Sequence, residues 1–311
     1  MANSADVLDY IIGQPPSAPH HISYNFLIPN LRGMENLFRA AEKAGSPFTT
    51  TVPNAPPTPP PSPRPGDREP LISLGDSYNV FSNTSSTNDP VDVARAPSSP
   101  YAVEISLFAA ATEAFSKANA NCTIAESLER FKPIVALAKS RNLRVRGYVS
   151  VALGCPFEGP NVSPSKVAEV TASLLEMGAD EVSVADTTGM GTAPRTEKLL
   201  KALNAAGIAN QDLALHFHDT YGQALVNAVV GLEHGIRTFD SSVGGLGGCP
   251  YAKGATGNVA TEDLVYCIHS LGARTGIDVE KVAEIGAWIT SQLGRPNESR
   301  AGKAVLARLA G

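Results

Sequence analysis

No run of eighteen apolar residues occurs in the sequence, so it contains no obvious membrane-spanning helix. Cysteine is also scarce, and no CxxC pair is present among Cys122, Cys155, Cys249 and Cys267. This spacing indicates neither a disulfide framework nor a zinc knuckle, and it fits a reducing compartment. The formal net charge of −5 and an isoelectric point near 5.7 argue against binding to nucleic acid or to an anionic membrane.

Neither end of this sequence resembles a common targeting signal. The opening stretch, "MANSADVLDYIIGQPPS", carries two aspartates and no arginine. That composition is typical of neither a secretory signal nor a mitochondrial transit peptide, so a cytoplasmic location stays open. The final residues, "ARLAG", do not form a peroxisomal tripeptide.

Residues 47–100 differ sharply in composition from the rest of the chain. They hold 13 of the 24 prolines, including "PNAPPTPPPSPRP", and continue into the Ser/Thr/Asn-rich stretch "NVFSNTSSTNDP". Such a segment supplies few helix or strand hydrogen bonds and has little apolar surface to bury, which predicts a disordered or extended insertion outside the core. It serves either as a solvated spacer or as a docking segment for an SH3-like partner.

From residue 101 onward, short β-branched apolar runs alternate with helical stretches at intervals of roughly 30–40 residues. The strands are predicted to be consecutive parallel neighbours near residues 102–108, 144–151, 181–186, 213–218 and 236–242. One more strand–helix unit, "SYNFLIPN" with "LRGMENLFRAAEKAG", precedes the insertion. Repeated βα units imply a parallel sheet. Polar residues at the strand ends favour a TIM-type (β/α) barrel, which binds its ligand at those ends.

The segment "HFHD" contains the most informative pair of residues. Because side chains alternate along a strand, His216 and His218 are expected to point to the same face. Two imidazoles placed in this way can bind a divalent metal. In the alternative interpretation, one histidine is a hydrogen-bonded core residue and the other lies at the surface. The position at the carboxyl end of a strand favours the metal site.

Three further polar residues lie on neighbouring predicted strands. Asp186 ends "EVSVAD" and either orients a histidine, contacts a substrate hydroxyl or caps the following turn. Arg146 and Tyr148 alternate onto one face of "RVRGYVS". An inward-pointing arginine needs an anionic partner, which is either a substrate carboxylate or an internal carboxylate such as Asp186 or Glu104.

A glycine-rich loop, "SSVGGLGGCPYAKGATGN", spans residues 241–258 and surrounds Cys249 with six glycines. Glycine is used where the backbone turns sharply or approaches a ligand closely. The loop is therefore either a surface loop with an incidental thiol or part of a ligand site.

The segments "HFHDTYGQALVNAVVGLEHG" and "SSVGGLGGCPYAKGATGNVATEDLVY" resemble the 3-hydroxy-3-methylglutaryl-CoA lyase family, as do "GYVSVALGCPFEG" and "EVSVADTTGMGT". The resemblance extends over roughly residues 101–300 and over "FLIPNLRGMENLFRAAEKAG" before the insertion. Related isopropylmalate and homocitrate synthases share the paired-histidine strand, but their loop carries a glycine–glutamate–arginine pattern without cysteine. The cysteine loop therefore favours a lyase.

This resemblance implies a metal-assisted retro-Claisen cleavage of 3-hydroxy-3-methylglutaryl-CoA into acetyl-CoA and acetoacetate, a reaction of leucine catabolism and ketone-body formation. It implies Mg²⁺ or Mn²⁺ held by His216, His218 and Asn258. Cys249 would donate or accept a proton at the carbon that leaves as the acetyl-CoA enolate, on a loop that closes over the substrate. His216 and Asp186 complete the expected catalytic group.

Arg146 and Tyr148 are the expected substrate-binding residues. The expected partners are a small acyl-CoA substrate, a second copy in a homodimer and a protein docked to the insertion, with neither nucleic acid nor membrane. A mitochondrial location follows from the resemblance alone.

The sequence departs from the family pattern before the insertion. The first strand of the family carries a "D-G-L-Q-N" segment with a catalytic arginine and a metal-binding aspartate, and its second strand carries a site glutamate; no such stretch occurs here. The barrel is therefore expected to be incomplete at its N-terminus, which leaves a catalytically impaired binding or regulatory paralogue as the alternative function. The predicted organisation is an N-terminal βα segment over 1–46, the insertion over 47–100, the lyase-like barrel over 101–300 and a tail over 301–311.

Overall fold

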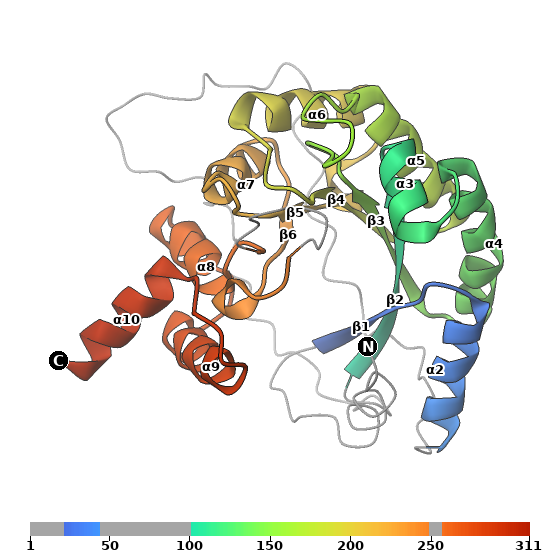
Figure 1. Ribbon diagram of the computed structural model, residues 1–311. Helices are drawn as coiled ribbons and strands as arrows, with labels where there is room; N and C mark the ends of the chain where they lie inside the picture. The colour runs from blue at the N-terminus through green and yellow to red at the C-terminus, as the bar shows by residue number, and fades with distance from the viewer. Residues whose placement is uncertain (1–21, 44–100, 249–256) are drawn as a thin grey trace, which may run out of the picture.

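The computed structural model of the protein describes residues 22–43, 101–248 and 257–311. Its strands form one parallel six-stranded sheet in which each strand pairs with its neighbour in the sequence. The sheet curls into part of a barrel (Figure 1), which confirms the predicted incomplete (β/α) barrel. The strands are β1 (Ile22–Leu27), β2 (Tyr101–Ala110), β3 (Arg144–Ser150), β4 (Glu181–Asp186), β5 (Leu213–Phe217) and β6 (Thr238–Asp240).

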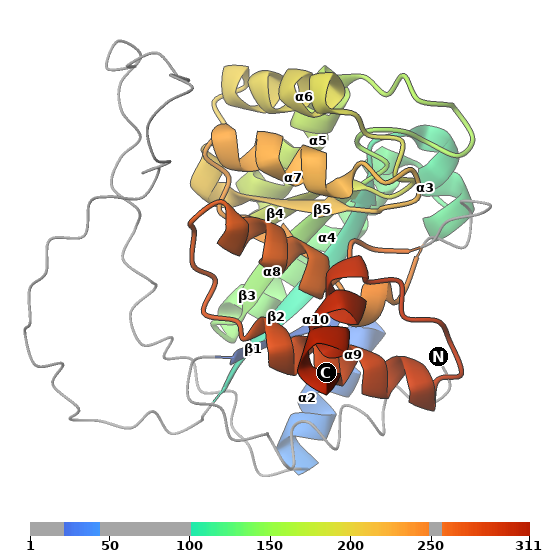
Figure 2. The same cartoon turned by 90° about the vertical axis from the view of Figure 1, so that its left-hand side faces the viewer.

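Helices follow the strands and cover the outer, convex side of the sheet (Figure 1). Seen from the side, α6, α7 and α8 run next to one another, and α9 and α10 lie beyond α8 (Figure 2). No helix in the described part of the chain is long and apolar enough to cross a membrane. The helices are α2 (Leu31–Lys43), α3 (Glu113–Ala120), α4 (Ile124–Ser140), α5 (Pro164–Met177), α6 (Ala193–Ala205), α7 (Ala224–Glu233), α8 (Thr261–Ser270), α9 (Val279–Gln292) and α10 (Arg300–Ala310), with 3₁₀ turns η1 (Asn210–Asp212) and η2 (Val243–Gly245).

Local sequence signals explain where these helices begin and end. Thr123 and Glu126 form a reciprocal capping box that satisfies two backbone N–H groups at the start of α4. Helix α5 begins at Pro164, whose fixed φ suits the first helical position, and stops at Gly178. Gly178 has a φ of +116°, which an L side chain rarely adopts.

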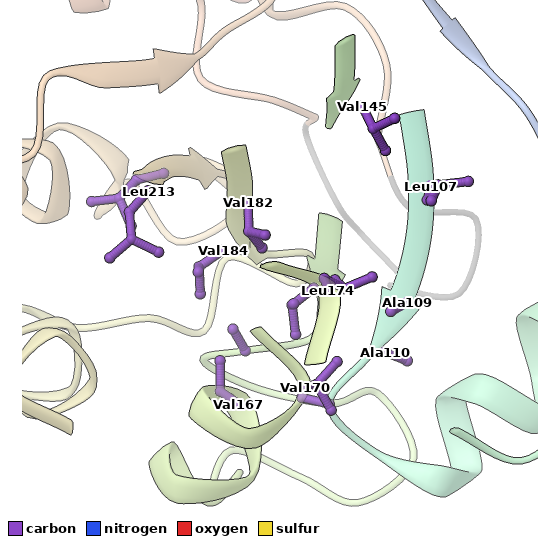
Figure 3. Packing of buried hydrophobic residues seen from close by; sticks show 14 of the residues in the cluster. Leu107, Ala109, Ala110, Val145, Val167, Val170, Leu174, Val182, Val184 and Leu213 are labelled. Carbon is purple, nitrogen blue, oxygen red and sulfur yellow. The ribbon is translucent and has the colours of Figure 1, made fainter. Parts of the chain in front are cut away.

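The hydrophobic core lies between the outer face of the sheet and the helices. Val145, Val182 and Leu213 project from three neighbouring strands toward this layer (Figure 3). Leu174 of α5 packs closely on β3, because a Cβ at Gly147 would lie only 3.0 Å from its Cδ1 atom. Because successive side chains of a strand point to opposite faces, the residues between these core positions lie on the inner face, outside the apolar layer.

The inner, concave face of the sheet carries a chain of polar contacts. On β1 and β2, the Asn25 amide donates to Glu104 Oε1 at 2.6 Å, and Ser106 donates to Asn25. Arg144 on β3 donates through Nε to Glu104 Oε2 at 3.1 Å. Burial raises the pKa of Glu104, and the hydrogen bond from Arg144 opposes that shift. Glu104 is therefore the partner of Arg144, and not of Arg146 as the sequence analysis had allowed.

A buried carboxylate joins the C-terminal helices to the turn that follows β6. Glu262, in the first turn of α8, is fully buried, and both of its carboxylate oxygens lie 3.0 Å from the backbone nitrogen of Gly244. Helix α9 passes close beside it, because a Cβ at Gly286 would lie 2.0 Å from Glu262 Oε1. Residues 301–311, expected to be a tail, form most of α10, which packs against α9.

The structure does not cover every sequence prediction. The proline-rich insertion over 47–100 and Cys249 of the glycine-rich loop lie outside the described residues.

Candidate active site

Two histidines mark the carboxyl end of the inner face. His216 and His218 come from the end of β5, with ring centroids 5.3 Å apart. Phe217 between them points the other way and is buried in the core. The alternation expected from "HFHD" therefore places both imidazoles on the same side of the sheet.

Asn258 reaches the same end of the sheet from the glycine-rich loop. It forms an isolated antiparallel bridge with His218, and the next residue, Val259, donates its backbone N–H to Phe217 O at 3.0 Å. The Asn258 amide nitrogen donates to Leu246 O at 2.9 Å, which fixes the orientation of the amide. Its oxygen, Oδ1, is buried and accepts no hydrogen bond in the described part of the chain.

The His218 ring presents a second buried atom without a partner. Among the described residues, nothing hydrogen-bonds to Nδ1 of His218. Burial lowers the pKa of His218 to about 4, with a smaller contribution from His216, so the ring is neutral near pH 7 and retains a lone pair. A buried nitrogen and a buried amide oxygen that both lack a donor fit the coordination of a divalent cation.

The donor set is short of carboxylates. Over residues 22–43, 101–248 and 257–311, no three His, Cys, Asp or Glu side chains gather in a group that could hold a metal. His216, His218 and Asn258 therefore offer two imidazoles and one amide oxygen. Magnesium prefers oxygen ligands and usually one or two carboxylates, so this trio alone predicts weak binding.

Asp240, a residue not singled out by the sequence analysis, is the centre of the inner-face network. Its Oδ1 accepts from Arg146 Nη1 at 2.7 Å, and its Oδ2 accepts from Ser183 Oγ at 2.7 Å. Nδ1 of His216 lies 3.2 Å from the same Oδ2. Burial opposes ionisation, but the hydrogen bond with His216 and the charge of Arg146 lower the pKa of Asp240 overall. The available signal was that Asp240 is the only acidic residue in the strand predicted over 236–242, the neighbour of the strand that carries His216.

Arg146 is neutralised within the protein. Besides Asp240, it pairs through Nε with Glu181 Oε1 at 2.7 Å. Arg146 therefore has internal carboxylate partners, which was one of the two alternatives from the sequence. The partners are Asp240 and Glu181, and not Asp186 or Glu104. A substrate carboxylate is not needed to balance its charge.

Tyr148 lies between Arg146 and the histidines. Its hydroxyl accepts from Arg146 Nη1 at 2.9 Å, and its ring meets that of His216 edge-on, with centroids 6.4 Å apart. Burial and then the negative charge of Asp240 raise the pKa of Tyr148 to about 12. The hydroxyl is therefore protonated near neutral pH and has its own proton to donate.

Asp186 occupies the opposite strand face from the histidines. In the sheet register it pairs with Phe217, whereas His216 pairs with Ala185. Its buried carboxylate accepts from Gly191 N at 2.8 Å, and a Cβ at Gly191 would come within 2.6 Å of Oδ2. The structure thus gives Asp186 the turn-capping contacts that were one of its three expected roles, and does not bring it against His216.

Replacement of Asp186 by asparagine is expected to reduce the pH dependence of stability. Burial raises the pKa of Asp186 to about 6 from 3.8, so the folded protein resists its ionisation. The stability this group contributes is complete below about pH 4 and is lost as the pH rises to about 6. A shift of this size corresponds to about 3 kcal/mol. Urea unfolding at pH 4 and pH 7 should show a smaller loss for Asp186→Asn than for the wild type.

The matched control is Asp180→Asn. The Asp180 carboxylate is partly exposed and accepts from Lys139 and from the backbone nitrogen of Val145. This variant should keep the wild-type loss between the two pH values. Equal losses of unfolding free energy between pH 4 and pH 7 in Asp186→Asn and the wild type would contradict a raised pKa for Asp186.

A cavity of about 360 Å³ lies beside Asn258, between the turn after β5 and the segment that precedes α10. Its lining includes the carboxylates of Asp219, Asp263 and Glu298, against the single guanidinium of Arg300. This excess of negative charge does not suit an anionic ligand.

The HMGL-like family model matches residues 76–289. The chain belongs to the HMGL-like family. The family resemblance found in the motifs is therefore confirmed. Enzymes of this family depend on a divalent metal ion.

Individual relatives agree with this assignment. The chain is 54% identical over 207 residues to a hydroxymethylglutaryl-CoA lyase of Pseudomonas mevalonii, which covers 67% of this chain and 68% of the relative. It is 52% identical over 208 residues to a mitochondrial hydroxymethylglutaryl-CoA lyase of Arabidopsis thaliana, covering 67% of this chain and 44% of that protein. The crystal structure of the Pseudomonas aeruginosa lyase superimposes with a TM-score of 0.73 at 40% identity, covering 99% of this chain and 80% of the other.

Proposed function

We propose that this protein is a carbon–carbon lyase that cleaves 3-hydroxy-3-methylglutaryl-CoA into acetyl-CoA and acetoacetate. The observation that carries the proposal is the 54% identity to the Pseudomonas mevalonii lyase. The strand that bears His216 and His218 and the segment that bears Asn258 lie within the family match over residues 76–289. Their arrangement on one inner face supports a reaction at the carboxyl ends of the strands.

His216, His218 and Asn258 are the proposed ligands of Mg²⁺ or Mn²⁺. When bound, the ion supplies Lewis-acid stabilisation of negative charge on a substrate oxygen. The orphaned atoms of His218 and Asn258 support their assignment as ligands. The backbone bridge to Asn258 fixes the main chain at His218, and burial excludes water from the neutral His218 ring.

Tyr148 is the proposed hydrogen-bond donor to a substrate oxygen. Its own oxygen already accepts from Arg146, which leaves the phenolic proton to point elsewhere. Arg146 acts through Tyr148 and Asp240, because its charge is balanced by carboxylates of the protein.

Cys249 is the proposed proton donor or acceptor at the carbon of the departing acetyl-CoA enolate. The other three thiols are poorly suited to this role. Cys122 and Cys155 are buried, and Cys155 shares a hydrogen bond with Thr112 Oγ1 at 3.2 Å. Burial raises the pKa of Cys267, which lowers its thiolate fraction at neutral pH.

A location in mitochondria is also part of the proposal, and the name of the Arabidopsis relative supports it.

The direct test is acetoacetate formation by the purified full-length chain supplied with 3-hydroxy-3-methylglutaryl-CoA and Mg²⁺ or Mn²⁺. We expect turnover that EDTA abolishes and that His218→Ala reduces by at least about 100-fold, because a ligand is lost. The matched control is His269→Ala, since His269 lies on α8 and, among the described residues, its side chain hydrogen-bonds only to the nearby Thr275. This variant should retain wild-type turnover.

Absence of acetoacetate under every metal condition, from a chain that folds, would overturn the lyase proposal. That outcome would favour the alternative of a binding or regulatory paralogue.

A further inference from the structure

We propose that Asp240 is a positioning residue that holds the His216 ring in the Nδ1–H tautomer and leaves Nε2 available for a ligand. The inference rests on the proposed function only for the identity of that ligand. The tautomer itself is a property of the protein before any ligand binds.

The sheet places these two residues side by side. In the pairing of β5 with β6, His216 and Asp240 are direct register partners, so their side chains project from the same face. His216 Nδ1 is 3.2 Å from Asp240 Oδ2. The ring orientation is thus set by a neighbouring strand and not by a mobile surface group.

The other contacts of Asp240 decide which atom carries the proton. Its two oxygens also accept from Arg146 Nη1 and Ser183 Oγ, each at 2.7 Å, so three strands supply donors to one carboxylate. A carboxylate with no proton can only accept hydrogen bonds, which requires His216 Nδ1 to donate. In the neutral ring Nε2 then carries a lone pair, the form that binds a cation.

An asparagine at position 240 is expected to move the His216 proton from Nδ1 to Nε2. A guanidinium has only donors, so Arg146 would donate to the single side-chain oxygen of the asparagine. The amide NH₂ would then face His216 Nδ1, which would have to accept, and the imidazole proton would move to Nε2. The Asp240→Asn substitution keeps the size of the side chain, removes its negative charge and replaces one acceptor oxygen by an NH₂ donor.

The test is a long-range ¹H–¹⁵N correlation spectrum of the full chain with ¹⁵N-labelled histidine, recorded near neutral pH without metal or substrate. The His216 signals are assigned by their loss in His216→Gln. We expect the Nδ1–H pattern in the wild type and the Nε2–H pattern in Asp240→Asn. An Nε2–H pattern in the wild type would overturn the proposal without any Asp240 variant, and so would an unchanged pattern in Asp240→Asn.

The matched control is Glu181→Gln. Glu181 is the other carboxylate partner of Arg146, with Oε1 2.7 Å from Nε, whereas the ion pair of His216 is with Asp240. This variant should leave the His216 tautomer unchanged. A tautomer change in Glu181→Gln as well would assign the effect to general disturbance of the network and overturn a specific role for Asp240.

A second readout addresses the ligand. Free Mn²⁺ measured by electron paramagnetic resonance should show about a 10- to 100-fold weaker affinity in Asp240→Asn, with Glu181→Gln close to the wild type. Unchanged affinity in a variant whose tautomer has switched would overturn the link to cation binding. Failure of the lyase proposal is a separate result, because it appears as missing acetoacetate and leaves the spectrum of the metal-free protein unaffected.

Discussion

Replacement of Arg146 by methionine is expected to lower the free energy of unfolding by about 3–5 kcal/mol, the usual effect of removing one partner from a buried ion pair. The side chain of Arg146 is only 11% exposed, and its two partners, Asp240 and Glu181, are 16% and 15% exposed. Methionine fills much of the same volume but leaves both carboxylates buried without a cation. Urea unfolding at pH 7 measures the loss.

The control is the same substitution two residues earlier on the same strand face. Arg144 pairs with Glu104 through a single contact at 3.1 Å, and its side chain is 38% exposed. Arg144→Met should therefore lose about 1 kcal/mol or less, as partly exposed pairs do. Similar losses in the two variants, or a small loss in Arg146→Met with a raised KM for the acyl-CoA, would favour the substrate-binding role instead.

Replacement of Cys249 by alanine is expected to reduce acetoacetate formation by about 10²- to 10⁴-fold, the contribution of a positioned general acid or base. Cys249 lies outside the described residues, so this prediction depends on the glycine-rich sequence around it and on the accessibility of the other thiols. Steady-state turnover of the full-length chain, with circular dichroism to verify folding, provides the measurement.

The matched control is Cys155→Ala. Cys155 also follows a strand in a segment rich in glycine and proline, but it is fully buried against Thr112. Its replacement should retain most of the turnover, and iodoacetamide should modify Cys249 before Cys155. Fast alkylation of Cys155, or full activity in Cys249→Ala, would show that the thiol has been assigned incorrectly.

The strand–helix order could be predicted because each element carries its own local signal. Short β-branched apolar runs between helical stretches identified the strands that became β2 to β5 to within a few residues. The last strand was expected over 236–242, but only Thr238–Asp240 pairs with β5, since the chain then turns into η2. The serines and glycines that follow Asp240 carry no sequence signal that marks the end of the strand.

Partners across the sheet could not be predicted in the same way. Arg146 and Asp240 lie 94 positions apart, and their contact depends on the register and curvature of four strands together. The face on which Asp186 lies could not be predicted either. Asp186 pairs in the sheet with Phe217 and not with His216, and this difference of one residue places it on the opposite face. A polar residue at a strand end indicates that a site is near, while the register decides whether it faces that site.

The Glu262 carboxylate has a consequence for how the chain can be shortened or joined to other domains. The backbone of Gly244 is held by this carboxylate, and the carboxylate is shielded in turn by Gly286 of α9. Removal of the last two helices would expose Glu262 to water, which would compete for its oxygens at the base of the glycine-rich loop. The C-terminal end is therefore a poor site for truncation even though it lies far along the chain from the histidines, and a fusion partner should be attached after α10.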